Sequence, residues 1–269
     1  MPELPEVETI VLQLKKKIVG KTIKSIEILD YKMVERKVKT LVPCKIINVY
    51  RRAKSIIIQL NEGNNLLVHL RMTGHFHYVN KNQIEKLKPY EKFIVAKFNL
   101  NDGSLLTHNS IRKFGSIKLF NDSKLAQELS QLGVEPLSRE FTLNKFKGML
   151  SNKLRANIKT TLMDQHFLVG IGNIYVQEAL YSARIAPQRK INTLKEKEIE
   201  LLYNSIRKIL SSAIKHHGTT VENYVHIEGS GGFQKFLSVY NKSVCPKKHP
   251  LKKINLGGRG TSYCPICQK

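Results

Sequence analysis

The spacing of apolar positions changes partway along the chain. Residues 1–125 carry short β-branched runs typical of strands: IKSIEIL, CKIINVY, SIIIQL, NLLVHL, FIVAKFNL and SIKLF. The turn-forming stretches NEGNN and LNDGS lie in the same region. Residues 3–20 differ, because Val7, Ile10, Leu14 and Ile18 repeat with helical spacing before Gly20. The pattern predicts an opening helix followed by antiparallel strands in a sandwich or barrel-like domain.

Beyond the Gly- and Pro-containing segment 132–138 (LGVEPLS), the spacing becomes helical. Helices are predicted over 141–150, 156–164, 173–184 and 193–217, and a strand-like, cysteine-bearing stretch follows from about residue 238. We therefore predict an α+β protein with an N-terminal domain (1–131), a linker (132–138), a helical domain (139–237) and a small C-terminal module (238–269).

The charge balance points to a polyanionic partner. The 269 residues include 45 Lys and Arg against 21 Asp and Glu, a formal net charge of +24. Such an excess suits phosphate contacts on nucleic acid, although a lysine-rich proteome would give the same bias. No run reaches the ~18 apolar residues of a membrane span. No secretory signal is visible, so a cytoplasmic protein associated with the nucleoid is expected.

Three of the four cysteines cluster near the C-terminus with metal-ligand spacing. Cys264 and Cys267 form a Cys-x-x-Cys knuckle, and Cys245 with His249 supplies a second pair. Thiolate and imidazole donors favour a tetrahedral, structural zinc ion. The alternative is a chance Cys-x-x-Cys beside a surface histidine. Cys44, in a strand-like run, is expected to be an ordinary buried thiol.

Two turns pair an apolar side chain with an arginine. HLRMTG holds Met72, and SIRKFG holds Arg112 and Phe114. Such groups could wedge into a base stack and replace a vacated partner, although Met and Phe are more often core residues. Two further features are individually weak. Asn173, after Gly170 and Gly172, is placed to cap a helix, and the Arg259 hairpin tip could be merely solvated.

The amino terminus, MPELPEVETI, raises a chemical possibility. If Met1 is removed, Pro2 becomes a free secondary amine beside Glu3. The structural alternative is a helix start with ordinary first-turn acids, which favour the helix dipole.

Taken together, these stretches resemble the formamidopyrimidine-DNA glycosylase family of base-excision repair enzymes. PELPEVET, RRAKS, HLRMTG, RKFG, LGVEPL, LMDQHFLVGIGNIY, HHGTT and a finger ending in CQK follow the family's order over essentially the whole chain. The resemblance implies an N-terminal β-sandwich, a helix–two-turn–helix domain and a zinc finger. It also implies a monomer that acts on double-stranded DNA containing oxidised bases or abasic sites.

The resemblance also implies roles for residues near the amino terminus. Pro2 would attack C1′ of the damaged nucleotide and form a Schiff base. Glu3 would act as acid and base, Glu6 would support it, and Lys54 would contact phosphate near the lesion.

Other residues match family positions that contact DNA. Met72, Arg112 and Phe114 match the trio that fills the void left by the flipped base. Further matches are phosphate-binding residues, a buried acid and residues of the loop that holds the lesion: Lys159, Asn173, Arg259, Glu178, Thr219 and Thr220.

Two departures qualify the match. The family's finger usually has four cysteines, but Lys248 stands at the position of the second one here and His249 follows it; Ser110 stands where aspartate is common. The leading hypothesis is a glycosylase and abasic-site lyase for oxidised purines, with zinc as its one structural ion. Leu4 weighs against the endonuclease VIII branch, which prefers oxidised pyrimidines and usually has glycine there. A non-catalytic lesion-binding protein is the remaining alternative.

Overall fold

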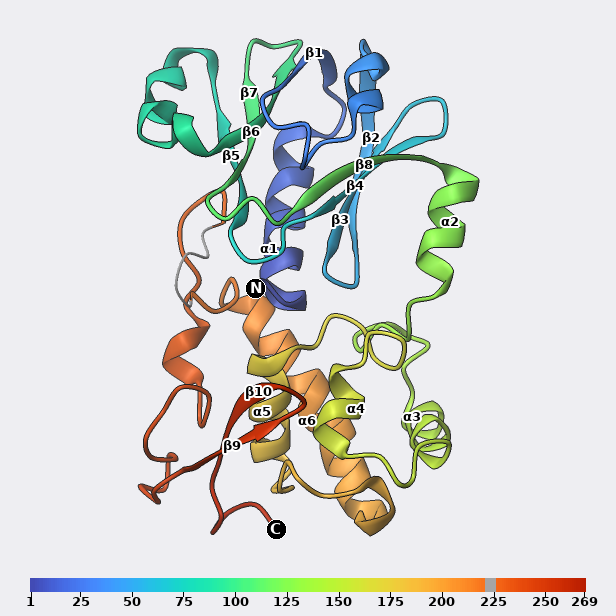
Figure 1. Ribbon diagram of the computed structural model, residues 1–269, viewed down its shortest axis with the longest axis vertical. Coiled ribbons are helices and arrows are strands. Elements are labelled where there is room, and N and C mark those ends of the chain that lie inside the picture. Colours follow the sequence, from blue (N-terminus) through green and yellow to red (C-terminus); the bar gives the residue numbers. More distant parts are fainter. Residues whose placement is uncertain (221–225) are drawn as a thin grey trace. The chain divides into compact units, whose positions relative to one another are not determined.

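The structure, a computed structural model, describes residues 1–220 and 226–269 (Figure 1). It divides into two compact units. The first comprises Met1–Ser130 and His217–Gly232, and the second comprises Gln131–His216 and Phe233–Lys269. None of the helices in these ranges is long and apolar enough to cross a membrane.

The predicted opening helix is confirmed as α1 (Leu4–Ile18). Pro5 lies in its first turn, where a missing N–H costs nothing and the fixed φ suits a helix. Val7, Ile10 and Leu14 are fully buried, as the helical spacing of apolar positions requires. The helix therefore holds the amino terminus against the core of the first unit.

Eight antiparallel strands form the sheet of the first unit in the order β5-β7-β6-β1-β2-β3-β4-β8. Their bounds are β1 Thr22–Ile28, β2 Cys44–Arg52, β3 Ser55–Leu60, β4 Asn64–His69, β5 Gly74–Val79, β6 Ile94–Leu100, β7 Leu105–Ser110 and β8 Ser116–Asn121. Strands β1 and β2 pair at only two positions, so this short pairing links two four-stranded halves. Two 3-10 helices and one α-helix complete the unit: η1 Arg36–Leu41, η2 Lys81–Phe93 and α2 Asp122–Ser130.

One core joins α1 to both halves of the sheet. It contains Ile10 of α1, Phe98 of β6 and Ile56 of β3. The sequence pattern missed β5 (GHFHYV), because two histidines replace the usual aliphatic residues of an alternating strand.

The second unit is helical, as the change of period predicts. Its elements are α3 Leu143–Ser151, α4 Ile158–Met163, α5 Asn173–Ser182, η3 Ile191–Thr193, α6 Glu196–Lys215, η4 Phe233–Phe236, β9 Lys252–Leu256 and β10 Arg259–Tyr263. Within it, Gly133 donates its backbone N–H to the carbonyl of Gln165 at 2.8 Å, which ties segment 132–138 to the loop before α5. The predicted α+β class, with a sheet domain, a helical domain and a terminal Cys/His module, is confirmed.

Candidate active site

The first turn of α1 brings together the residues at the amino terminus. Pro2 is buried, and Glu3 and Glu6 are 3% and 2% exposed. The backbone N–H of Glu3, the N-cap residue, donates to Glu6 Oε2 at 2.8 Å. Two buried carboxylates beside a buried Pro2 are a more specific arrangement than surface acids at a helix start.

Glu6 also binds the segment that follows α6. Its Oε1 accepts the backbone N–H of Thr219 at 2.7 Å. Gly218 has φ +77°, and a Cβ there would lie 2.8 Å from Glu6 Oε1, so only glycine fits without displacement. Glu6 therefore links the helix start to Thr219.

The same segment contains the other predicted loop residues. Thr220 Oγ1 accepts the backbone N–H of Gly231 at 2.7 Å, which holds the two limbs of the segment together. Residues 221–225, which belong to the predicted lesion loop, lie outside the described residues.

Lys54 lies in the two-residue turn between β2 and β3 and is 7% exposed. Arg51 fixes this turn by donating to Glu8 Oε2 at 2.7 Å and to the carbonyl of Ala53 at 2.8 Å. Burial, together with the positive charges of Arg71 and Lys54, lowers the pKa of nearby His69 to about 4. The buried Lys54 and the exposed Arg71 together form an electropositive site suited to an anion such as phosphate.

Met72, Arg112 and Phe114 form one exposed group. Arg112 Nη1 lies 3.3 Å from Met72 Sδ, and its guanidinium carbon is 5.3 Å from the Phe114 ring centroid. Met72 is 37% exposed and Phe114 59% exposed, which excludes a core role in the described state. Thr73 Oγ1 accepts the backbone N–H of Arg112 at 2.9 Å and so supports the arginine turn.

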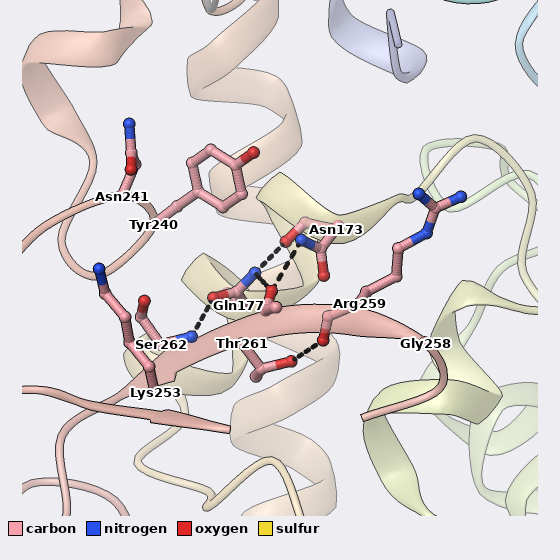
Figure 2. A pocket seen from close by; sticks show the side chains of 10 residues that line it. Asn173, Gln177, Tyr240, Asn241, Lys253, Gly258, Arg259, Thr261 and Ser262 are labelled. Carbon is pink, nitrogen blue, oxygen red and sulfur yellow. Dashed lines mark hydrogen bonds between the residues drawn. The ribbon is translucent and has the colours of Figure 1, made fainter. Parts of the chain in front are cut away.

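In the second unit, Asn173 and Arg259 line the same polar pocket of about 430 Å³ (Figure 2). In this view Asn173 lies between Tyr240 and Arg259. The predicted cap is wrong in detail, since Gly172 is the N-cap and Asn173 is the first helical residue of α5. The Asn173 side chain instead donates to the carbonyl of Gly260 at 3.0 Å. The pocket thus joins the start of α5 to the finger hairpin.

Sequence reasoning missed further polar residues of this pocket, including Gln177, Tyr240, Asn241 and Lys253. No motif distinguishes them, because their position follows from the packing of β10 against α5. Glu178 helps to place Tyr240, since its carboxylate accepts the backbone N–H groups of Ser238, Val239 and Tyr240 at 2.7, 3.0 and 2.8 Å. The pKa of Glu178 is raised, because the effect of burial exceeds the opposing effect of these N–H groups.

Lys159 differs from a simple surface phosphate binder. It is fully buried in α4, and its Nζ lies 3.5 Å from the carbonyl oxygen of Leu256 on β9. The Lys159 ammonium therefore lies between α4 and the finger hairpin.

The four predicted metal ligands come together. The ligand atoms of Cys245, His249, Cys264 and Cys267 all lie within 4.8 Å of one another. His249 turns Nδ1 to the sulfurs, 3.3 Å from Cys267 Sγ and 3.7 Å from Cys264 Sγ. A tetrahedral zinc site has Zn–S and Zn–N distances of about 2.3 and 2.0 Å, so the ligand atoms of such a site lie about as close to one another as these four do. The cluster could hold a metal ion. Cys44 is buried apart from it, as expected.

Comparisons with known proteins match the whole chain. The family model described as the formamidopyrimidine-DNA glycosylase N-terminal domain matches residues 1–117, and the model of the formamidopyrimidine-DNA glycosylase H2TH domain matches residues 132–225. The formamidopyrimidine-DNA glycosylase of Pelotomaculum thermopropionicum is 40% identical over 280 residues, covering 100% of this chain and 99% of the relative. The enzyme of that name from Rickettsia conorii is 39% identical, with the same coverage.

Solved structures of Lactococcus lactis Fpg are similar over their full length. One is a variant bound to DNA containing Fapy-dG, with a TM-score of 0.90, 35% identity and 100% of both chains covered. Another is bound to DNA containing an abasic site, with a TM-score of 0.90, 34% identity and 99% of both chains covered.

Proposed function

This chain belongs to the formamidopyrimidine-DNA glycosylase family, and on that premise we propose that it excises oxidised purines from DNA and then cleaves the abasic site. The observation that carries the proposal is the amino-terminal turn, where a buried proline directly follows Met1 and two buried carboxylates accompany it. The DNA lesions in the related Lactococcus lactis structures, Fapy-dG and an abasic site, support this substrate class.

Pro2 is the nucleophile of the proposed reaction. Met1 is 48% exposed, and its removal leaves the proline nitrogen as a free secondary amine. An α-amino group has a pKa of about 7.7–8.0, so a useful neutral fraction exists near pH 7, unlike a lysine at about 10.4. The nitrogen bonds to C1′ while the bond from C1′ to the base breaks, and the base leaves with a proton.

Glu3 supplies the proton transfers of the later steps. Protonation of the sugar ring oxygen opens the ring and leaves an iminium between Pro2 and C1′. Loss of a proton from C2′ then expels the 3′ phosphate, and loss of a further sugar proton expels the 5′ phosphate. Water releases the sugar remnant and restores the amine. Glu6 supports this turn through its bonds to Glu3 and Thr219.

Lys54 binds a phosphate beside the lesion, which fits the low exposure and positive surroundings of its turn. The reaction needs the damaged base outside the stack, because C1′ is otherwise shielded. Met72 fills the vacated space, Arg112 bonds the orphaned cytosine and Phe114 wedges the neighbouring step. Their exposure as one group fits this task.

The second unit contributes phosphate binding. Asn173 and Arg259 bind phosphate at the polar pocket. Lys159 contributes its positive charge from its buried position against Leu256 of the finger hairpin. Glu178 holds the backbone near Tyr240 in place. In the first unit, Thr219 and Thr220 belong to the segment that receives the flipped base.

We assign zinc to the Cys/His cluster. Three thiolates and one imidazole, Cys245, Cys264, Cys267 and His249, are the donor set that zinc prefers for a closed structural site. Zinc would cross-link the base of the finger and so keep its hairpin in place, with no part in the chemical steps.

The assigned roles divide along the chain. Residues 1–131 carry the chemistry, 132–138 form the linker, 139–237 bind DNA and 238–269 form the finger. Within 139–237, His217–Gly232 belong to the first compact unit. The protein is proposed to act as a monomer at the chromosome. An oxidised-pyrimidine substrate is the second candidate, because wild-type Lactococcus lactis Fpg was also crystallised with DNA containing an oxidised pyrimidine.

A borohydride trap tests the proposal. Purified protein is mixed with a duplex carrying 8-oxoguanine opposite cytosine, and intact mass establishes whether Met1 is removed. An adduct that maps to Pro2 is expected, and Pro2→Gly should reduce it. Pro5→Ala, in the same turn, is the matched control and should trap like wild type. No adduct from protein that lacks Met1 and binds the duplex would instead favour another lesion or a binding protein without catalysis.

A further inference from the structure

The side-chain amide of Gln177 bonds the backbone of β10 as a neighbouring strand would. Among the strands of residues 1–220 and 226–269, β10 pairs with β9 alone, along one edge. On the other edge, Gln177 Oε1 accepts the backbone N–H of Ser262 at 2.6 Å, and Nε2 lies 3.4 Å from the carbonyl oxygen of Gly260. These two backbone groups flank Thr261 and point the same way, as the groups that bond a neighbouring strand do. One side-chain amide therefore satisfies both.

The same amide reaches the start of α5. Gln177 Nε2 donates to the carbonyl of Asn173 at 2.6 Å, and Asn173 Nδ2 donates to the carbonyl of Gly260 at 3.0 Å. Gln177 and Asn173 thus converge on one backbone carbonyl of the hairpin (Figure 2). Gln177 is only 2% exposed, so these bonds form away from solvent competition.

Arg259 immediately precedes the carbonyl that is held. The hairpin turns through Gly257 and Gly258, with φ +60° and +69°, and Arg259 opens the returning strand. A two-residue turn with both φ values positive fixes the strand register tightly. Fixing Gly260 against α5 therefore also fixes the backbone from which the Arg259 side chain projects.

We propose that Gln177 is a positioning residue that sets the spacing between Asn173 and Arg259, and so the fit of the pocket to DNA phosphates. This inference rests on the proposed function. The glutamine amide offers a donor and an acceptor on separate atoms, whereas methionine matches the volume of glutamine without either hydrogen-bonding group. The effect is exerted through Arg259, so it disappears when Arg259 is removed.

A double-mutant cycle with full-length protein tests this mechanism. Binding to a duplex with a tetrahydrofuran abasic-site analogue is measured across a salt series. Gln177→Met should weaken binding about 10-fold and lower the salt slope by about one phosphate contact. Single-turnover excision from a saturated complex with a cleavable 8-oxoguanine duplex should stay unchanged. In an Arg259→Ala background, Gln177→Met should change affinity less than about 2-fold. Equal weakening in both backgrounds, or unchanged binding, would overturn the inference.

Two controls separate positioning from damage to the fold. Ser205→Ala removes the buried bond from Ser205 to Ser182 in the same unit, and it should lower thermal stability without changing the salt slope. If Gln177→Met does not fold, Gln177→Asn replaces it, because it keeps the amide but withdraws it from β10 by one methylene. Wild-type protein that fails to bind the duplex would refute the proposed function itself. Normal wild-type binding with an unaffected variant refutes only the role of Gln177.

Discussion

Ser110 Oγ accepts the backbone N–H of Lys113 at 3.1 Å and closes the turn from which Arg112 projects. Aspartate is common at this position in the family. A hydroxyl can accept the same type of backbone bond. The backbone N–H of Arg112 bonds Thr73 Oγ1, so the N–H groups of two consecutive residues of this turn, Arg112 and Lys113, are both held by side-chain hydroxyls.

Ser110→Ala should therefore loosen the arginine without unfolding the domain. Loss of one such bond costs about 0.5–1.5 kcal/mol, so excision of 8-oxoguanine opposite cytosine should slow by up to about 10-fold. Ser104→Ala is the control, since Ser104 is also buried and bonds Asp102 away from this turn. Single-turnover rates measure both. Equal slowing in the two variants would contradict a specific role for Ser110.

Met72 and Phe114 should matter for DNA and not for stability. Both are exposed, so alanine at either position removes little buried area. Stacking of an aromatic ring on a base contributes about 1–3 kcal/mol, so Phe114→Ala should lower affinity for abasic-site DNA about 5- to 150-fold, and Met72→Ala should also lower it. Ile84→Ala removes an equally exposed apolar side chain on η2 and should change neither property. A fall in melting temperature that accounts for the lost binding would refute the assignment.

Sequence reasoning succeeded where the signal is local. The helix at Leu4–Ile18 follows from apolar spacing, and the metal ligands follow from the Cys-x-x-Cys knuckle and the preceding Cys/His pair. It failed where position depends on tertiary packing. Gln177 and Tyr240 have no motif, and their role emerges only when β10 lies against α5. Strand β5 was missed because histidines occupy two of its positions, one of which, His75, is buried only through tertiary packing.

The Cys/His cluster should bind one zinc ion per chain, measured by elemental mass spectrometry. His249→Ala should lose zinc and weaken DNA binding, because the finger hairpin is no longer cross-linked. His249→Cys should keep the ion, since four thiolates also form a closed site. His166→Ala, an exposed histidine of the same unit, should retain full occupancy. Stoichiometric zinc in His249→Ala would exclude this histidine as a ligand.

His108 should make the first unit sensitive to acid. It is fully buried, and neither ring nitrogen has a hydrogen-bond partner among the described residues. Burial lowers its pKa to about 3, while an unfolded histidine titrates near about 6.5. The unfolded chain therefore takes up the proton first, and stability falls as the pH drops below about 6.5.

The His108→Phe variant should flatten this pH dependence. The loss in wild type is at most about 1.4 kcal/mol per pH unit for one histidine, measured by urea unfolding between about pH 7.5 and 5. His166→Phe, at an exposed position, should keep the wild-type slope. An unchanged slope in His108→Phe would assign the acid sensitivity to other groups.

Gln13 should separate base excision from abasic-site cleavage. Its Nε2 donates to His226 Nδ1 at 2.9 Å, and its Oε1 accepts the backbone N–H of Ile227 at 3.0 Å. Because Ile227 fixes the amide orientation, His226 must offer an unprotonated Nδ1, and its Nε2–H faces the carbonyl of Ser230 at 3.1 Å. These bonds anchor the far limb of the proposed lesion-holding segment to α1, the helix that follows Pro2.

Gln13→Met keeps the volume and loses the bonds to His226, Ile227 and Glu228. Excision of 8-oxoguanine should slow about 10-fold, the effect of roughly 1.4 kcal/mol, because the segment that receives the base is no longer held. Cleavage of a preformed abasic site should proceed at the wild-type rate, since that substrate has no base to hold. Glu27, which forms an ion pair with Lys97 at 3.1 Å on the surface of the first unit, provides the control variant Glu27→Gln. Equal slowing on both substrates by Gln13→Met would show that Gln13 supports α1 itself and not the recognition of the lesion.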